Sequence, residues 1–290
     1  MNTSSDYDIA CLSCHKPSRS LPEFKCRVCG GPLEVKLKGD FNTERIHTKI
    51  HSLWRYNEFF PYVIEKNIIT LGEGWTPIVK FAKKVYLKLD NLNPTGSFKD
   101  RGSTVLVSAL HESVRDAEGF FSEDSSGNAG ASMAAYSARA GLRAKIYVPK
   151  AVSGPKFNQT RFYGADVVKV SGSRSRVAEK AQTAEKGKFY VGHIYHPFFR
   201  DGIRTLAYEI AEQLDWKPPE RIYLPVSAGT LLLGVIRGFK HLAKSGAINA
   251  MPTIIACQTR QVSPLYHRTK HIAYKPPERV TSVADALVST

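Results

Sequence analysis

The most constraining feature of the sequence is a regular alternation of short β-rich runs and segments with helical spacing after residue 72. Seven runs are typical of strands: 85–90, 119–124, 145–149, 166–170, 189–192, 221–225 and 253–258. Segments with Ala, Leu and Glu at helical spacing lie between them, at 104–111, 129–140, 174–186, 205–214 and 231–243. Repeated strand–helix units predict an α/β fold with mostly parallel sheets covered on both faces, and ligands outside the carboxyl ends of the strands.

Length and composition are those of an ordinary soluble globular protein. The 290 residues suffice for one large core or two smaller ones, and 42% are hydrophobic and 23% charged. The first ten residues are polar and acidic and lack the apolar stretch of a secretory signal, and no apolar run approaches the roughly 18 residues of a membrane span. We therefore expect a cytoplasmic protein without a membrane partner.

The charge balance narrows the choice of partners. The 41 basic and 26 acidic residues give a net charge of +15, which suits nucleic acid, an anionic surface or small anionic ligands. Residues 1–60, the segment most like a nucleic-acid module, hold nine Lys/Arg and seven Asp/Glu and are nearly neutral. This distribution argues against nucleic acid and favours small phosphorylated or carboxylated molecules. Alternatively, the basic excess only keeps the surface well solvated and attracts no particular ligand.

Paired cysteines near the N-terminus indicate a metal site. Four of the five cysteines form two C-x-x-C doublets: Cys11, Cys14, Cys26 and Cys29. This is the spacing of two zinc knuckles, each of which supplies two thiolates to one tetrahedral ion, and cytosolic thiols stay reduced. We expect a zinc-ribbon-like segment with structural zinc, or a knuckle that has lost its metal. His15 is expected to be a turn residue and Cys257 a small core residue.

The motif Ser-Phe-Lys-Asp-Arg-Gly at 97–102 carries the strongest chemical signal. It follows the turn sequence Asn-Pro-Thr-Gly at 93–96 and puts Lys99 at the start of a helix, near an aromatic ring and other cationic groups. Desolvation and like-charge repulsion disfavour the charged form of such a lysine. A lysine becomes able to form a Schiff base in this way, so we predict that Lys99 is the catalytic residue.

Two loops after predicted strands are rich in small residues and precede helices. The first anion loop, residues 125–130 (Ser-Ser-Gly-Asn-Ala-Gly), exposes backbone N–H groups suited to a carboxylate. The second anion loop, residues 226–230 (Val-Ser-Ala-Gly-Thr), is suited to a phosphate. Either loop alone also fits a purely structural turn. Together with Lys99, the two loops predict a lysine, a carboxylate site and a phosphate site along one edge of the sheet.

These motifs, with Glu-Gly-Trp-Thr-Pro at 73–77, resemble the signatures of pyridoxal-phosphate enzymes of the tryptophan synthase β fold, or fold type II, and most closely those of threonine synthases. The resemblance runs from about Cys11 to the end. It implies a doubly wound body of two subdomains and pyridoxal 5'-phosphate as cofactor, with Lys99 forming the aldimine and Asn128 bonding the phenolic oxygen. It also implies substrate-carboxylate contacts by Ser126, Gly127 and Ala129, and cofactor-phosphate contacts by Ser227, Ala228, Gly229 and Thr230.

Resemblance to threonine synthases also implies a reaction. O-phosphohomoserine and water would give threonine and phosphate, with Lys99 moving protons at Cα and Cβ once the substrate has displaced it. The substrate is a small anionic amino acid whose phosphate needs cationic or amide partners. The candidate contacts are Lys156, Arg161, His196, Arg200 and Arg204.

One segment departs from the threonine synthase pattern, Asn-Pro-x-x-x-x-Gly-Gln-Lys-Thr. Here His196, Ile203 and Arg204 stand at the Asn, Gln and Lys positions, which bears on how a substrate phosphate is bound. Other pyridoxal-phosphate reactions therefore stay open: a β- or γ-replacement or elimination such as a cysteate synthase-like reaction, or a serine/threonine ammonia-lyase. A zinc-ribbon adaptor or a truncated, inactive relative are alternatives of another class.

Three stretches are expected along the chain: a zinc-ribbon-like segment over 1–40, a linking arm over 41–71 and a catalytic body over 72–290. Family members continue beyond the stretch matched by 283–286 and bring a Ser or Thr to the pyridine nitrogen. We therefore expect a body that is short at its C-terminal end, with Ser289 or Thr290 as the candidates for that contact. The family is usually dimeric, which implies a homodimer.

Overall fold

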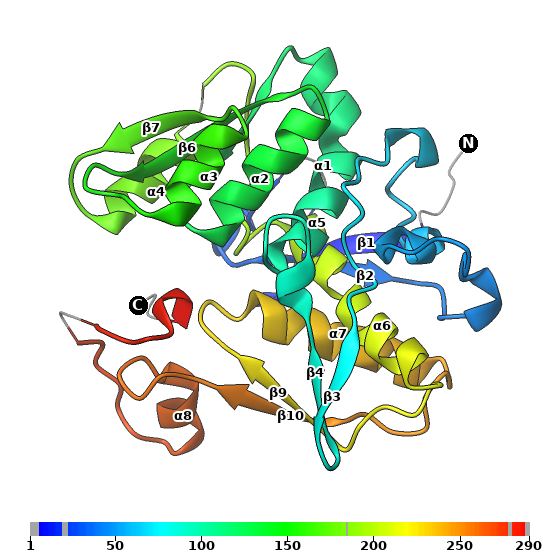
Figure 1. Cartoon of the computed structure of the whole chain (residues 1–290). Helices are drawn as coiled ribbons and strands as arrows, with labels where there is room; N and C mark the ends of the chain where they lie inside the picture. The colour runs from blue at the N-terminus through cyan, green and yellow to red at the C-terminus, as the bar shows by residue number, and fades with distance from the viewer. Residues whose placement is uncertain (1–5, 19–22, 184, 278–279, 288–290) are drawn as a thin grey trace.

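The computed structural model describes residues 6–18, 23–183, 185–277 and 280–287 (Figure 1). The strands are β1 (Tyr7–Cys11), β2 (Leu33–Leu37), β3 (Ile78–Ala82), β4 (Val85–Lys88), β5 (Phe120–Glu123), β6 (Arg143–Pro149), β7 (Asp166–Val170), β8 (Lys188–Tyr190), β9 (Arg221–Pro225) and β10 (Thr253–Cys257). The helices are α1 (Lys99–Asp116), α2 (Asn128–Arg139), α3 (Pro155–Phe162), α4 (Arg174–Gln182), α5 (Pro197–Ile203), α6 (Thr205–Gln213), α7 (Thr230–Lys244) and α8 (Pro264–Thr269). Short 3-10 helices cover Thr43–Arg45, Leu53–Phe59, Glu65–Asn67, Asp90–Leu92 and Asp285–Leu287. Ser289 and Thr290 lie outside the described residues.

A four-stranded parallel sheet with the order β7-β6-β5-β8 forms the first subdomain. The chain runs outward from β5 through α2 to β6 and through α3 to β7, and then returns through α4 to β8, on the other side of β5. Because crossovers between parallel strands are right-handed, this reversal puts α4 on the opposite face from α2 and α3. The strand order thus changes direction between β5 and β8, the position at which open α/β sheets bind ligands.

The second subdomain is built around α6 and α7 (Figure 1). β9 and β10 pair in parallel, and β3 and β4 form an antiparallel hairpin. The buried face of α7 packs against α6 and α5. Gly238 permits this approach, because a Cβ there would lie 2.4 Å from the carbonyl oxygen of Arg204. The second subdomain therefore meets α5 through a closely packed helix.

Residues 41–71 are packed against the body. Trp54, Tyr56 and Phe59 are buried in the 3-10 helix of this arm. The buried Arg55 forms a bidentate pair with Glu212 of α6, with nitrogen–oxygen distances of 3.1 and 2.6 Å. Such a fork-shaped pair restricts both distance and orientation, so it holds the arm against the second subdomain.

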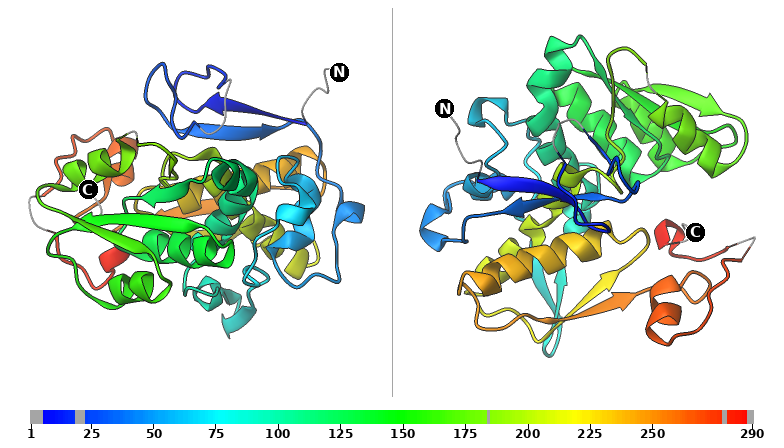
Figure 2. Two further views of the ribbon diagram at one scale, coloured as in Figure 1. Left: turned by 90° about the horizontal axis from the view of Figure 1, so that it is seen from above. Right: turned by 180° about the vertical axis from the view of Figure 1, so that it is seen from behind.

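The β1–β2 hairpin carries the cysteine segment and lies across the junction of the two subdomains (Figure 2). The beginning of β2 is joined to the loop before α5, where the N–H of Leu33 donates to the carbonyl of Tyr195 (3.3 Å). In the first subdomain, the ring of Phe24 packs edge-on against Tyr190, with 4.6 Å between ring centres. The cysteine segment is thus packed against the body at two places.

The predicted fold class is confirmed, and all seven predicted strands are present. β7 and β9 have the predicted bounds, whereas β3 was not predicted because its residues are mostly exposed and show no apolar alternation. The prediction that Cys257 belongs to the core is wrong: it is exposed at the end of β10, in a sheet of only two strands. Within the described residues, no helix combines the length and apolar character needed to cross a membrane.

Candidate active site

Lys99 is the first residue of α1 and directly follows a tight turn. The turn over 93–96 closes with a hydrogen bond from the N–H of Gly96 to the carbonyl of Asn93 (2.7 Å). Gly96 has φ of 82°, a left-handed conformation that costs glycine little. The turn therefore brings the chain sharply into the helix and sets the direction in which Lys99 leaves it.

The surroundings of the Lys99 ammonium are mostly uncharged. Its Nζ lies 4.2 Å from the ring centre of Phe98 and 3.5 Å from Oγ1 of Thr230. Burial lowers the pKa of Lys99 to about 8, and the carboxylate of Glu123 acts in the opposite direction. A lysine with this pKa is neutral in an appreciable fraction of molecules near neutral pH, as a nucleophilic amine must be.

The residue after the lysine anchors the turn. The buried carboxylate of Asp100 accepts hydrogen bonds from the N–H and the hydroxyl of Thr95 (2.7 and 2.6 Å) and from the hydroxyl of Ser132 on α2 (2.6 Å). Burial raises the pKa of Asp100, although these donors act to lower it. Asp100 thus joins the lysine turn, α1 and α2 into one unit.

A buried ionic cluster fixes the next residue. The guanidinium of Arg101 contacts Asp90 and Glu209 at 2.6 Å each, and the Arg101 and Glu209 side chains are both fully buried. Lys88 at the end of β4 lies 2.9 Å from the second oxygen of Glu209. These contacts connect α1 with the second subdomain through α6 and β4, so the lysine helix is held from both subdomains.

The first anion loop lies half-buried at the carboxyl end of β5. A Cβ on Gly127 would meet no atom within 4 Å, so there is open space beside this residue. Gly130 instead allows tight packing, since its Cβ would lie 1.9 Å from the carbonyl oxygen of Ser125. Oδ1 of Asn128 is buried without a hydrogen-bond partner among the described residues. The loop therefore has both room and an unused polar group for a ligand.

The second anion loop begins α7 and lies beside the lysine. Gly229 has φ of 85° and open space next to it, and Thr230 is buried with its hydroxyl oriented towards Lys99. Ser227 is half-buried and Ala228 is exposed. The structure therefore brings Lys99 to the start of the second anion loop.

Two further site residues were not predicted, Glu123 and His193. Oε1 of Glu123 lies 3.0 Å from Nδ1 of His193, and Oε2 accepts from the backbone N–H of His193 (3.2 Å). The Glu123 side chain is fully buried and that of His193 is 13% exposed. A signal was available in the sequence, since Glu123 ends the predicted strand 119–124 and His193 directly follows the predicted strand 189–192. The missing information was that these two strands are neighbours.

The two predicted phosphate contacts on α3 differ in position. Nζ of Lys156 donates to the carbonyl of Thr95 (2.8 Å), in the turn before Lys99. It also lies 3.2 Å from the amide oxygen of Gln159. Arg161 is exposed on the same helix. Lys156 is therefore the one of this pair that lies beside the lysine turn.

The three predicted contacts at α5 are buried. Arg204 donates to the carbonyl of Phe59 (2.8 Å) and pairs with Asp201 (3.0 Å). These contacts hold the arm against α5. Arg200 donates to the carbonyl of Ile194 (2.6 Å), and its Nε and Nη2 have no partner among the described residues. Burial lowers the pKa of His196 to about 3, so its ring is neutral. In the described part of the chain, none of the hydrogen bonds of these side chains reaches Lys99 or either anion loop.

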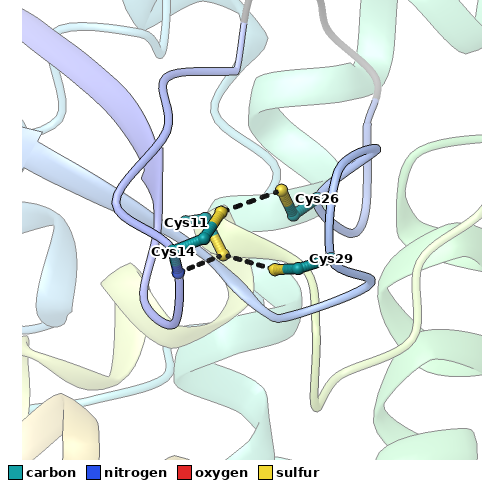
Figure 3. A group of neighbouring side chains, drawn as sticks. All are labelled: Cys11, Cys14, Cys26 and Cys29. Atoms are coloured by element: carbon teal, nitrogen blue, oxygen red, sulfur yellow. Dashed lines mark hydrogen bonds between the residues drawn. The ribbon is translucent and has the colours of Figure 1, made fainter.

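The four cysteines of the two doublets converge on one point (Figure 3). Their sulfur atoms all lie within 4.8 Å of one another, with 3.4 Å between Cys11 and Cys29 and 3.7 Å between Cys14 and Cys26. His15 has φ of 59°, a turn conformation, and is not part of the cluster. Four sulfur ligands from two knuckles match the tetrahedral preference of zinc.

The thiol chemistry of this cluster also fits a metal. Burial acts to raise the pKa of Cys11, but the N–H groups of Cys14 and Ser13, together with the thiols of Cys29 and Cys14, lower it to about 6. The N–H of Gly31 acts to lower the pKa of Cys29, but the thiols of Cys11 and Cys14 raise it. Because a zinc ligand must be a thiolate, backbone donors that stabilise the thiolate favour metal binding. The donor set is therefore suited to structural zinc.

Three features of the lysine site fit pyridoxal phosphate. Lys99 is an amine with a lowered pKa, Asn128 has an unused buried amide oxygen, and open space adjoins Gly127 and Gly229. The second anion loop adds backbone N–H groups at the beginning of a 15-residue helix, which favour a phosphate. Pyridoxal phosphate combines an aldehyde, an aromatic ring and a phosphate, and so matches these features of the site.

Comparison with known proteins supports this interpretation of the site. Residues 69–290 match the model of a family described as pyridoxal-phosphate dependent enzyme, and the chain belongs to this family. A threonine synthase of Methanocaldococcus jannaschii is 33% identical, with 94% of this chain and 71% of that protein aligned. One of Methanosarcina acetivorans is 31% identical, with 97% of this chain and 72% of that protein aligned. Within the pyridoxal-phosphate enzymes, the chain is therefore a member of the threonine synthase family.

Solved structures support the fold. The processed form of threonine deaminase isoform 2 from Solanum lycopersicum superposes with a TM-score of 0.63 at 21% identity, covering 94% of this chain and 72% of that chain. At this identity the likeness concerns the arrangement of helices and strands alone. It confirms a fold-type-II body.

Proposed function

We propose that this protein is a threonine synthase that converts O-phosphohomoserine and water into threonine and phosphate. The observation that carries the proposal is the 3.5 Å approach of Lys99 Nζ to the hydroxyl of Thr230, since it puts a partly neutral amine beside a phosphate-binding loop. The relatives that bear the name threonine synthase support this reaction among those known for the cofactor.

Lys99, Asn128 and the two anion loops have separate roles in the proposed reaction. Pyridoxal phosphate, when bound, supplies an electron sink for negative charge on the substrate carbon. The second anion loop would hold its phosphate through Ser227, Ala228, Gly229 and Thr230, and Asn128 would bond its phenolic oxygen. The first anion loop would bind the substrate carboxylate through Ser126, Gly127 and Ala129. Lys99 would take and return protons at Cα and Cβ of the substrate.

The phosphate of the substrate needs a cation of its own. Lys156 is the best placed of the predicted contacts, because its ammonium lies at the turn that leads into Lys99. Arg161 lies further out on the same helix, and contacts by His196, Arg200 and Arg204 stay predictions. The net charge of +15 favours the approach of such an anionic substrate. A homodimer with one structural zinc per chain completes the proposal.

The test is turnover by the purified full chain supplied with pyridoxal phosphate. We expect O-phosphohomoserine to yield threonine and phosphate in equal amounts. Lys99→Ala should abolish both this turnover and the visible absorbance of the bound cofactor while the protein stays folded. Lys240→Ala, which changes an exposed lysine of α7, is the matched control and should keep both.

Other outcomes would identify the alternatives. Ammonia and keto-acid release from serine or threonine, without phosphate release from O-phosphohomoserine, would contradict the proposal and indicate an ammonia-lyase. Preference for another phosphorylated amino acid would indicate a β- or γ-replacement. Retained cofactor absorbance in Lys99→Ala would mean that another lysine holds the cofactor.

A further inference from the structure

The first anion loop is entered through two consecutive buried carboxylates, and both are held by residues at the end of β8. Nδ1 of His193 lies 3.0 Å from Oε1 of Glu123, and the hydroxyl of Tyr190 donates to Asp124 (2.6 Å). Asp124 directly precedes the loop at 125–130. Side chains from β8 therefore fix the point at which the chain leaves β5 and enters the loop.

Tyr190 is itself held from two sides. Its ring packs edge-on against Phe24 of the cysteine segment, with 4.6 Å between ring centres and 74° between ring planes. On the other side, Gly192 leaves room for the hydroxyl, because a Cβ there would lie 2.3 Å from the hydroxyl oxygen. A buried ring packed in this way has few alternative orientations, so its hydroxyl is a fixed donor to Asp124.

Phe24 is close along the chain to the four-cysteine cluster. It lies two residues before Cys26, whose sulfur is 3.7 Å from that of Cys14 in the other doublet. Lys25, between Phe24 and Cys26, forms a β-bridge with Pro32. A metal held by both doublets would fix the position of Cys26, since metal binding and local folding are coupled in such knuckles. It would thereby restrict the movement of Phe24.

We propose that Phe24 and Tyr190 are positioning residues for the first anion loop, and that metal in the four-cysteine cluster strengthens carboxylate binding by the loop through them. The inference rests on the carboxylate role of this loop in the proposed function. When the metal is lost, Phe24 no longer supports the Tyr190 ring, and the hydrogen bond to Asp124 weakens. A loop that must be ordered on binding has a lower affinity for its ligand than one that is already ordered.

Other contacts of the cysteine segment lead elsewhere. The N–H of Leu33 donates to the carbonyl of Tyr195 (3.3 Å), and Glu34 pairs with Arg237 of α7. These contacts hold β2 against the loop before α5 and against α7. Phe24 instead contacts β8, and the next contact from there is with the residue that precedes the first anion loop.

Three variants separate the links of this chain of contacts. Tyr190→Phe removes the hydroxyl that bonds Asp124 and keeps the ring that packs against Phe24. Phe24→Leu removes the aromatic packing and leaves the four cysteines in place. Tyr147→Phe is the matched control, because Tyr147 lies on β6 in the same buried cluster as Tyr190 and undergoes the same chemical change.

The experiment measures amide hydrogen exchange of residues 125–130 in the full chain with zinc added and without cofactor. Tyr190→Phe should speed this exchange by about tenfold, since a hydrogen bond to a buried carboxylate is lost. Phe24→Leu should speed it by a smaller factor, and Tyr147→Phe should leave it unchanged. Chelation of zinc should speed it in the unmodified sequence and add little in Phe24→Leu. Exchange in β6 is the internal reference.

Steady-state kinetics give a second measurement that a general loss of stability would not reproduce. Tyr190→Phe should raise the KM for O-phosphohomoserine by about fivefold or more and change kcat by less than about twofold, because a looser carboxylate site weakens the binding of substrate and transition state alike. Tyr147→Phe should change neither value.

The outcomes separate this inference from the proposed function. Unchanged loop exchange in folded Tyr190→Phe, or an equal rise in Tyr147→Phe, would overturn the inference. If Tyr190→Phe does not fold, unchanged loop exchange in Phe24→Leu would do so. Loop exchange that ignores chelation, or that responds fully to it in Phe24→Leu, would overturn the role of the metal. Faster loop exchange in Tyr190→Phe without threonine formation by the unmodified chain defeats only the proposed function.

Discussion

The ammonium of Lys156 lies 2.8 Å from the carbonyl oxygen of Thr95, so α3 is tied to the turn that precedes Lys99. This contact brings a cation from the first subdomain next to the Lys99 site. Because Lys156 bonds only neutral oxygens here, its charge is not neutralised by a carboxylate at contact distance among the described residues. It is therefore available to an anionic ligand, such as the phosphate of the proposed substrate.

We predict that Lys156→Met raises the KM for O-phosphohomoserine by about tenfold or more, since a charge-assisted contact is lost. The free energy of unfolding should fall by no more than about 2 kcal/mol, since two partly exposed hydrogen bonds are lost. Steady-state kinetics and urea denaturation measure the two effects. Arg161→Met, on the exposed part of α3, is the control. Equal KM values in the two variants would exclude direct contact by Lys156.

The half-buried Lys99 should lower the free energy of unfolding, because its surroundings disfavour its charge. Its pKa is about 8 in the folded protein and about 10.4 in an unfolded chain. Below pH 8 the folded state must keep a buried charge, and the cost disappears as the pH rises through this window. Without cofactor, Lys99→Met should therefore raise the free energy of unfolding at pH 7 by about 1–3 kcal/mol, with a smaller gain at pH 10. Urea denaturation at both pH values checks this, and no gain at pH 7 would contradict it. Lys240→Met, at an exposed position, should show no gain.

The fully buried Arg101–Glu209 pair should make a large contribution to the free energy of unfolding that is lost in acid. Burial acts to raise the pKa of Glu209, but Arg101 and Lys88 outweigh it and lower the pKa to about 2. Since the pKa of an unfolded glutamate is about 4.3, the stabilisation is complete above about pH 5 and is lost as the pH falls towards 2. Glu209→Gln should lower the free energy of unfolding by about 3–5 kcal/mol at pH 7. The stability of this variant should also depend less on pH in acid, as measured by urea denaturation from pH 7 to 3. Asp40→Asn, in an exposed ion pair, should change little.

Metal removal should act on the β1–β2 hairpin first. We expect one zinc per chain by elemental analysis, because four sulfur ligands close a tetrahedral site. Chelation should raise amide hydrogen exchange in β1 and β2 while β5 and β6 stay protected. Cys26→Ser should lose the zinc, and Cys257→Ser, at the exposed cysteine outside the cluster, should keep it. Equal metal content in the two variants would show that the cluster is not the zinc site.

Much of the fold could be predicted from local patterns. Strand and helix periodicity is a short-range property, so β7 and β9 were predicted with their observed bounds. The Lys99 motif and both anion loops were likewise predictable, because turns rich in glycine and serine ahead of helices are encoded within a few residues. β3 escaped prediction although its partner β4 was predicted, since the exposed apolar residues of β3 show no regular alternation.

The sequence by itself determined which residues can react and which loops can bind anions. Only the tertiary structure decided which of them meet. Glu123 and His193 are 70 residues apart and pair because β8 lies beside β5, whereas Arg204, a predicted substrate contact, is buried against Asp201 and Phe59. The physical reason is that burial and pairing depend on the order of strands and the packing of helices, which arise from contacts between distant segments. The chemical type of a side chain is fixed locally, but its burial, and with it its pKa, is set by its neighbours in space.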